Sequence, residues 1–178
     1  EHTKFLGDTL AEIAREKGGI IKKGVSVIVG EQRPDAYGVI REICDKLDAP
    51  IIHVKPIPNV PIASPGEHQR WNFAAAVTAV RAAGVELDDE TIHRVASETT
   101  IPGRLHEIAP DLFVDVAHTP ESAAVLATEI ERRYPDRDRT MVFACQGDKN
   151  LSELVLTLAP LANRVILPHM PGVRSMPP

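Results

Sequence analysis

An aspartate and a histidine follow the apolar run Leu112-Phe-Val at a spacing suited to ligand binding. Asp115 and His118 stand in the segment Asp-Val-Ala-His-Thr-Pro, directly before a stretch with helical character. The carboxyl ends of strands are where α/β sheets collect their ligand-binding side chains. The pair therefore indicates a ligand site at a strand end. The alternative is structural: Asp115 would be a local cap and His118 a satisfied surface imidazole.

A second pair of reactive side chains lies near the start of the chain. His2 is on a loop, and Lys17 closes a short helix that Asp8 or Thr9 can cap and that ends at a glycine pair. An imidazole and an amine so placed suit a metal site. We expect partial burial of Lys17 beside the core, which would lower the pKa of its amine. The alternative is a solvated lysine that the helix dipole favours.

Three further places carry polar groups that could contact a ligand. Asn72 lies early in an alanine-rich helix over residues 66–84, where an asparagine is otherwise a capping group. Arg104 follows a Pro-Gly turn, and its guanidinium could fork onto phosphate oxygens or form an interdomain salt bridge. Asp148 and Lys149 follow a strand and a glycine, although charged loop pairs are usually only solvated.

Helical and strand-like segments alternate along the chain, which predicts an α/β fold. A connector with four prolines, residues 55–66, should be extended and cannot join a central strand. Helices are expected at 34–46, 88–97, 121–133 and from 151, and strands at 25–29, 50–54, 112–115, 140–144 and 163–167.

Composition limits the classes of function. The chain has 178 residues, 43% of them hydrophobic, a net charge of −5 and a pI near 5.8. Its scattered basic residues argue against nucleic acid as a partner. No apolar run is long enough for a membrane span and no signal peptide is visible, so we expect a cytoplasmic protein. Cys44 and Cys145 lack metal-ligand spacing and are expected to be buried thiols.

Several of these segments together resemble the folylpolyglutamate synthase and dihydrofolate synthase family, a branch of the Mur ligase superfamily. The resemblance covers His2, Leu-Gly, Ile-Ala-x-Glu-Lys17 and Gly-Ile-Ile-Lys near the start, and continues through Gly-x-His-Gln-x-x-Asn72 and Pro-Gly-Arg104. It ends in Asp-x-Ala-His118-x-Pro, where Thr119 replaces the usual asparagine. Threonine can still cap the next helix but lacks the amide.

The resemblance implies roles for residues at a metal and acyl-phosphate site. His2 would ligate Mg²⁺, and Lys17, carbamylated by CO₂, would help to hold that site. Asp148 and Lys149 would lie near the acyl phosphate. Together with His118, the residues Lys17, Asp148 and Lys149 are the candidate catalytic set, and K⁺ is a further candidate cation.

The resemblance also implies a nucleotide site. Asn72 would contact the adenine of ATP, Arg104 its phosphates or adenosine, Asp115 the ribose and His118 the phosphates. Residues 1–101 would be the later part of an ATP-binding central domain. Residues 102–178 would begin a Rossmann-like C-terminal domain, with both domains incomplete.

The implied activity is an ATP-dependent ligation of L-glutamate to a folate or dihydropteroate carboxylate through an acyl phosphate, by a monomer. One alternative is another Mur-type amino acid ligase. Gln69 argues against it, because a glutamine at this position of the motif resembles the folate-ligase variant. The other is a noncatalytic nucleotide-binding fragment, because no Gly-x-x-x-x-Gly-Lys-Ser/Thr phosphate loop occurs in the chain. The activity of the 178 residues alone is therefore doubtful.

Overall fold

A computed structural model describes residues 7–145 and 151–169 of the chain. The chain divides into two compact units. The first comprises Glu1–Ala63 with Glu67–Thr99, and the second comprises Ser64–Gly66 with Thr100–Pro178. Each unit is described by itself below. The assignment of these units to the two domains of a ligase stays a prediction.

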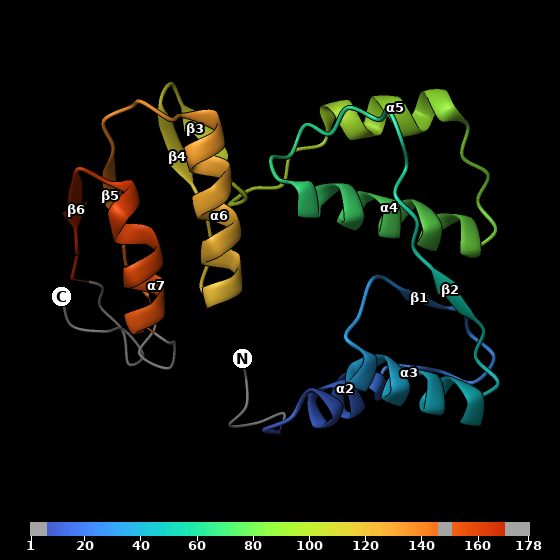
Figure 1. The fold of residues 1–178 in the computed structure, drawn as a ribbon. Coiled ribbons are helices and arrows are strands. Elements are labelled where there is room, and N and C mark those ends of the chain that lie inside the picture. The colour runs from blue at the N-terminus through green and yellow to red at the C-terminus, as the bar shows by residue number, and fades with distance from the viewer. Residues whose placement is uncertain (1–6, 146–150, 170–178) are drawn as a thin grey trace. The chain divides into compact units, whose positions relative to one another are not determined.

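The first unit opens with two helices that pack on each other beside a parallel strand pair (Figure 1). The order is α2 (Leu10–Gly18), β1 (Val27–Val29), α3 (Pro34–Lys46) and β2 (Ile51–His53), and Val27 pairs with Ile51. This is the predicted βαβ arrangement. The buried contacts between α2 and α3 involve Ala14, Ala36 and Val39.

Helix α2 begins at a complete capping box. The Thr9 hydroxyl accepts from the Glu12 backbone N–H, and the Glu12 carboxylate accepts from the Thr9 backbone N–H. These bonds satisfy N–H groups that a helix start otherwise leaves unpaired. They also lower the pKa of Glu12, with the Thr9 side chain as the largest cause. Thr9 is therefore the cap, and Lys17 is fixed in the last turn.

Two further helices complete the first unit, α4 (Glu67–Ala82) and α5 (Asp89–Glu98). Their core consists of Val60, Val77, Ile92 and Ala96. The connector over residues 54–66 has no helix or strand, as its prolines predict, and Ala63 N donates to Ala96 O at 2.9 Å. Helix α4 carries the chain's single tryptophan, Trp71, which is half-buried.

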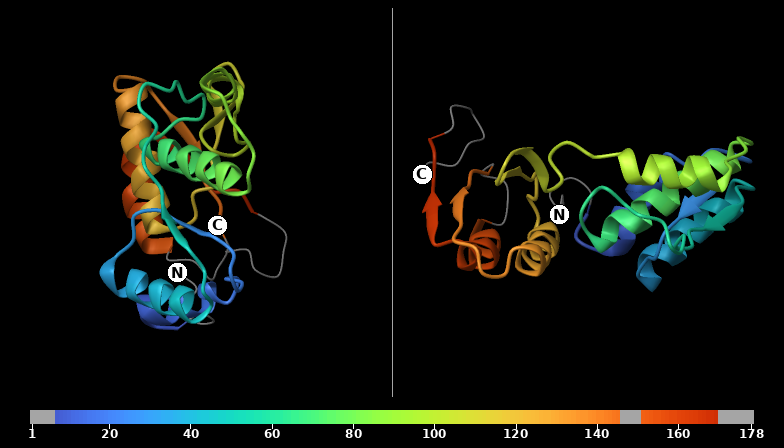
Figure 2. Two further views of the ribbon diagram at one scale, coloured as in Figure 1. Left: turned by 90° about the vertical axis from the view of Figure 1, so that its right-hand side faces the viewer. Right: turned by 90° about the horizontal axis from the view of Figure 1, so that it is seen from above.

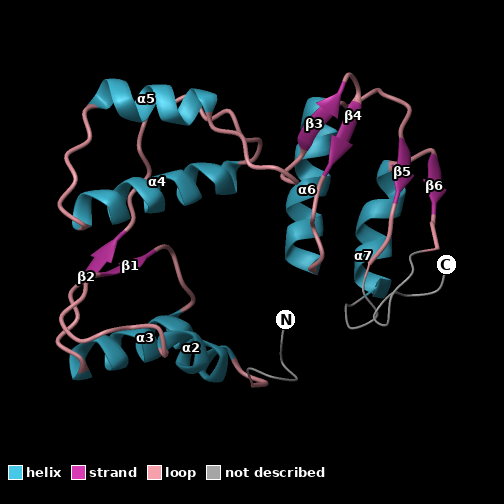
Figure 3. Cartoon of the chain, turned by 180° about the vertical axis from the view of Figure 1, so that it is seen from behind, coloured by secondary structure: helices cyan, strands magenta, loops and turns pink. Residues whose placement is uncertain are grey.

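The second unit contains two separate strand pairs (Figure 3). Strands β3 (His106–Ala109) and β4 (Leu112–Val114) form an antiparallel hairpin, and β5 (Thr140–Val142) and β6 (Arg164–Ile166) are parallel. Helices α6 (Pro120–Arg133) and α7 (Leu151–Leu158) lie on one side of these strands (Figure 2, right). A short 3₁₀ turn, Ala159–Leu161, follows α7. The core consists of Ala123, Leu154, Leu158 and Leu161.

Two sequence expectations differ from the structure. Strand β3 was not predicted; it pairs with β4 across a Pro-Asp turn in which Asp111 has φ +60°. Cys145 is only half-buried, whereas Cys44 is 1% exposed. Within the described residues, no helix combines the length and apolarity that a membrane crossing requires.

Candidate functional site

The loop after β4 is organised by the Asp115 carboxylate. Its Oδ2 accepts from the Leu105 backbone N–H and its Oδ1 from the Ala117 backbone N–H, both at 2.7 Å. Asp115 is half-buried. Each of its oxygens keeps a second lone pair, so the carboxylate can hold the loop and still accept a bond from a ligand. The structural alternative for Asp115 is thus realised without excluding a ligand contact.

The Pro-Gly-Arg turn lies against this loop. Val116 N donates to Gly103 O at 3.0 Å, next to the bond from Leu105 to Asp115. Gly103 has φ +73°, and a Cβ there would lie 2.9 Å from Val116 Cγ1. Only glycine meets both demands at this position. The structure therefore brings the backbone of Arg104 beside Asp115, as the sequence hypothesis requires, and the Arg104 side chain is half-buried.

His118 is exposed and its ring is oriented by the backbone. Nδ1 lies 2.9 Å from Val116 O. A carbonyl only accepts, so Nδ1 carries the hydrogen, and in the neutral ring Nε2 is the acceptor. In the neutral ring, Nε2 can then accept a hydrogen bond from a ligand. In the protonated ring, Nε2 can donate one to a phosphate oxygen.

Helix α6 begins directly after His118. Thr119 is its N-cap and accepts from Ser122 N at 3.0 Å, while Ser122 Oγ accepts from Thr119 N and His118 N. Thr119 thus caps as expected. Ser122 was missed by the sequence analysis, because the usual capping-box signal has Glu or Gln three residues after the cap. Hydrogen bonds from the Glu121 backbone N–H and from the Thr119 side chain lower the pKa of Glu121. The Glu121 carboxylate therefore already accepts hydrogen bonds at the N-terminus of α6.

The start of α4 holds a chain of three polar side chains. Asn72 Nδ2 donates to Gln69 Oε1 at 3.1 Å, and Gln69 Nε2 lies 3.0 Å from His68 Nε2. Gln69 is 3% exposed, whereas Asn72 and His68 are exposed. Buried amides need hydrogen-bond partners. Gln69 obtains them from its neighbours and leaves Asn72 Oδ1 as an acceptor for an external donor.

Lys17 does not lie where we expected it. Its side chain is exposed, so the predicted partial burial is wrong for the described residues. The lysine stands at the rim of an apolar cavity of about 550 Å³ lined by α2, β1 and α3. The helix dipole stabilises an ammonium group in the last turn of a helix, and this stabilisation does not require burial.

The described residues do not assemble a metal site. Among residues 7–145 and 151–169, no group of three His, Cys, Asp or Glu side chains could hold a metal ion. Mg²⁺ prefers oxygen ligands, and an unmodified lysine supplies none. His2, Asp148 and Lys149 lie outside the described residues. Their predicted roles are therefore untested.

Comparison with known proteins gives relatives that are named as dihydrofolate or folylpolyglutamate synthases. The dihydrofolate synthase/folylpolyglutamate synthase of Bacillus subtilis is 26% identical over 195 residues, which cover 93% of this chain and 45% of the relative. The dihydrofolate synthetase of Saccharomyces cerevisiae is 28% identical and matches 99% of this chain and 48% of its own length. The chain thus spans about half the length of the curated relatives that it matches. No family model matches it.

A solved structure shares the fold. The Mycobacterium tuberculosis folylpolyglutamate synthase complexed with ADP has a TM-score of 0.84 and 25% identity, over 97% of this chain and 45% of that protein. An Escherichia coli FolC complexed with DHPP and ADP, at 24% identity and a TM-score of 0.83, supports the fold alone. The predicted α/β fold of the Mur-ligase type is confirmed, and nearly the whole of this chain is similar in sequence and fold to part of the folylpolyglutamate and dihydrofolate synthases.

Proposed function

We propose that residues 1–178 are part of an ATP-dependent ligase that joins L-glutamate to the carboxylate of a folate or a dihydropteroate. The observation that carries the proposal is the joined pair of segments in the second unit. There the Arg104 turn and the Asp115–His118 loop are tied by backbone bonds, and relatives with both names match nearly the whole chain. An ADP complex among the solved relatives supports a nucleotide ligand.

The proposed reaction has two steps. The substrate carboxylate attacks the terminal phosphorus of ATP, which gives an acyl phosphate and ADP, and the glutamate amine then attacks the acyl carbon and releases phosphate. Arg104 is suited to fork onto phosphate oxygens. His118 would contact the phosphates through Nε2, because Nδ1 is held by Val116 O. Asp115 would accept from a ribose hydroxyl.

In the first unit, Asn72 is the proposed adenine contact. The Asn72 side-chain N–H donates a hydrogen bond to Gln69. The Asn72 Oδ1 atom is then available to accept from a donor such as the adenine amino group. We retain residues 1–101 and 102–178 as the proposed parts of the central and C-terminal ligase domains. A monomeric state and a cytoplasmic location stay predictions.

Mg²⁺ and the carbamylation of Lys17 belong to the same proposal, with His2 as the other metal ligand. The exposure of Lys17 leaves its amine open to CO₂. We expect native mass spectrometry in bicarbonate to show one added CO₂ that Lys17→Ala abolishes. Lys23→Ala, at another exposed lysine, is the control. Equal loss in both variants would contradict a specific site.

Calorimetric titration of the chain with ADP tests the nucleotide site. Arg104→Ala should weaken binding roughly 10-fold or more, the effect of losing a charge-assisted hydrogen bond. Arg94→Ala removes an exposed arginine that forms an ion pair with Glu98, and should leave binding unchanged. Equal affinities of the two variants would exclude Arg104 from the site. Glutamate addition to folate by the longer protein would test the ligase activity, and binding without turnover would favour the noncatalytic alternative.

A further inference from the structure

The side chains at the start of α4 form a hydrogen-bond relay that has a direction. Gln69 and Asn72 are three residues apart, so they share a face of the helix and can bond to each other. Asn72 Nδ2 donates to Gln69 Oε1 at 3.1 Å, and Gln69 Nε2 lies 3.0 Å from His68 Nε2. Hydrogens are therefore donated one way, from Asn72 to Gln69 and from Gln69 to His68.

His68 sets the direction of this relay. The amide nitrogen of Gln69 only donates, so His68 Nε2 is the acceptor and Nδ1 carries the ring hydrogen. With the other tautomer, the Nε2–H group would require Gln69 to turn Oε1 toward it. Gln69 Nε2 would then face Asn72 and would require Asn72 Oδ1 as its acceptor. The orientation of both amides therefore follows from the position of one hydrogen on His68.

Burial holds Gln69 to its partners in the relay. Gln69 is 3% exposed, and a buried amide that lacks hydrogen bonds costs free energy. The charged neighbours in the same turn pair with each other, because Glu67 lies 3.4 Å from Arg70 Nε, and Arg70 also donates to Val60 O. Asn72 is exposed, which leaves its Oδ1 and the second hydrogen on Nδ2 for a ligand.

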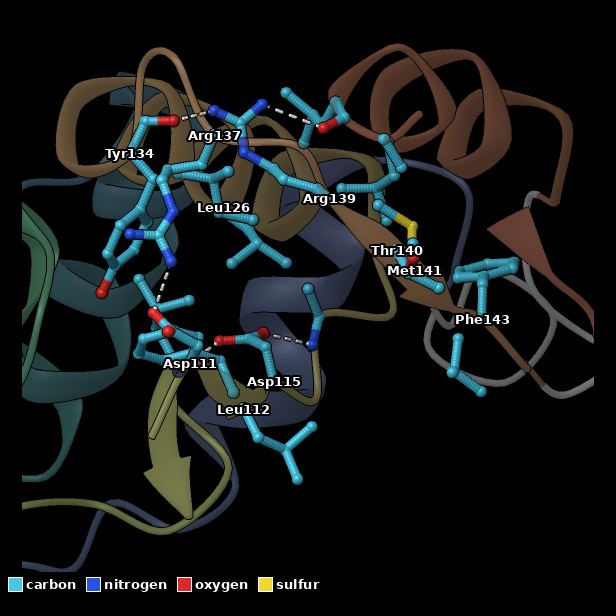
Figure 4. A pocket seen from close by; sticks show the side chains of 18 of the residues that line it. Asp111, Leu112, Asp115, Leu126, Tyr134, Arg137, Arg139, Thr140, Met141 and Phe143 are labelled. Atoms are coloured by element: carbon cyan, nitrogen blue, oxygen red, sulfur yellow. Dashed lines mark hydrogen bonds and ion pairs between the residues drawn. The ribbon is translucent and has the colours of Figure 1, made fainter. Parts of the chain in front are cut away.

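An amide differs in one respect from the carboxylate that organises the loop after β4. Asp115 accepts through both of its oxygens (Figure 4), so a half-turn of this carboxylate would change nothing. A half-turn of an amide exchanges a donor for an acceptor. The group that Asn72 presents to a ligand is therefore decided by Gln69, even though Gln69 is buried.

We propose that Gln69 is a positioning residue that makes this site select 6-aminopurine over 6-oxopurine nucleotides. The inference rests on the proposed contact between Asn72 and the base. With one Nδ2 hydrogen bound to Gln69, Asn72 presents Oδ1 beside its other N–H, and this pattern matches the amino group and N7 of adenine. Hypoxanthine has nearly the same shape, but its oxygen would face Oδ1 with no hydrogen between them. The relay therefore rejects the oxo base by polarity.

Titration of the ¹⁵N-labelled chain with ADP and with inosine diphosphate (IDP), followed by NMR, measures this selection even where binding is weak. IDP carries hypoxanthine in place of adenine. We expect ADP to bind about 10-fold or more tightly, because the oxo base leaves two acceptors facing each other unpaired. Gln69→Leu removes the acceptor for Asn72 Nδ2 and lets the Asn72 amide turn. The ratio of the two affinities should then fall to within about 3-fold of one.

Two further variants separate positioning from a structural role. Gln69→Glu keeps an oxygen for Asn72 Nδ2 whether the new carboxyl group is ionised or protonated, so it should keep the preference for ADP. Thr78→Val removes a different side-chain hydrogen bond of α4, from Thr78 Oγ1 to Ala74 O, and should keep the preference too. If Gln69→Leu weakened ADP and IDP equally, the role of Gln69 would be structural and the inference would be overturned.

The ring nitrogens of His68 allow a test without any ligand. At a pH where the ring is neutral, we expect their ¹⁵N shifts to place the hydrogen on Nδ1. A hydrogen on Nε2 would overturn the inference, because Gln69 would then have to present Oε1 to His68 and Nε2 to Asn72.

Asn72→Ala distinguishes a failure of this inference from a failure of the proposed function. If Asn72→Ala removed the preference for ADP but Gln69→Leu kept it, only the inference would be overturned. If Asn72→Ala kept the preference, the proposed contact with the base would be contradicted as well. If the unaltered chain bound neither nucleotide, the proposed function and the inference would both be contradicted.

Discussion

The loop after β4 and the end of α2 both carry predicted site residues, but they are built in opposite ways. In the first, carboxylate and backbone bonds fix Asp115, the His118 ring and the backbone next to Arg104. In the second, Lys17 is exposed at the rim of an apolar cavity. A site held by local bonds can be preorganised by this chain itself. A site that needs burial depends on whatever covers the cavity.

The largest difference between the two regions should appear on removing their charged groups. Asp115→Ala leaves the N–H groups of Leu105 and Ala117 without their acceptor, and hydrogen bonds to a charged group contribute about 1.5–3 kcal/mol each. We expect the second unit to lose about 3 kcal/mol of stability in urea denaturation followed by hydrogen exchange. Lys17→Ala should change the first unit by less than about 0.5 kcal/mol. Similar losses of stability in both units would show that the loop after β4 is no more preorganised than the end of α2.

The Gly103 turn should be the next most sensitive point. Gly103→Ala forces a side chain into the left-handed region and against Val116, which should destabilise the second unit by about 1–2 kcal/mol. Gly24 also has positive φ, at +70°, but a Cβ there would have open space around it. Gly24→Ala is therefore the control for strain without contact. An equal cost at both positions would mean that the approach to Val116 is unimportant.

The two capping threonines allow a direct comparison of similar groups. Thr119→Ala and Thr9→Ala each remove a helix cap, and each should cost about 1 kcal/mol. Only Thr119→Ala should also disturb the backbone of His118, because the lost Thr119 hydroxyl donates to Ser122 Oγ, the atom that accepts from His118 N. The NMR resonances of the His118 ring should shift in Thr119→Ala and should be unchanged in Thr9→Ala. Unchanged resonances in both variants would separate the cap from the site.

The smallest expected effect is on pH dependence. Hydrogen bonding from Arg132, assisted by Arg133, lowers the pKa of Glu129 below its usual value, against the opposing effect of burial. A carboxyl whose pKa is lower in the folded state stabilises the protein above its unfolded value of about 4.5, and this stabilisation is lost as pH falls through the folded value. Glu129→Gln should flatten the acid side of the stability curve for the second unit. An unaltered stability curve would show that the Glu129 carboxylate is equally solvated in the folded and unfolded states.

Local signals predicted most of the fold. Helix α3 has the predicted bounds, and α5 and α6 differ from theirs by one residue, because caps and prolines mark helix ends directly. Strands were placed correctly but are only three residues long, since their pairing depends on partners that a local pattern does not contain. The hairpin strand β3 was missed for the same reason.

The candidate site was predictable only in part. The spacing of Asp115 and His118 identified the loop after β4, and the Pro-Gly-Arg motif identified the turn beside it. The bonds that tie them, from Leu105 to Asp115 and from Val116 to Gly103, join residues ten or more positions apart and have no local signal. The exposure of Lys17 depends on tertiary packing, so its predicted burial could not follow from helix spacing alone.

Trp71 gives this molecule a built-in optical probe. It is the chain's single tryptophan and lies in α4, within the first unit, while the second unit contains Tyr134 but no tryptophan. Fluorescence excited at the red edge of aromatic absorption, where tyrosine does not absorb, will therefore report the melting of the first unit alone. Circular dichroism will report both, and the difference between the two signals separates the unfolding of one unit from that of the other.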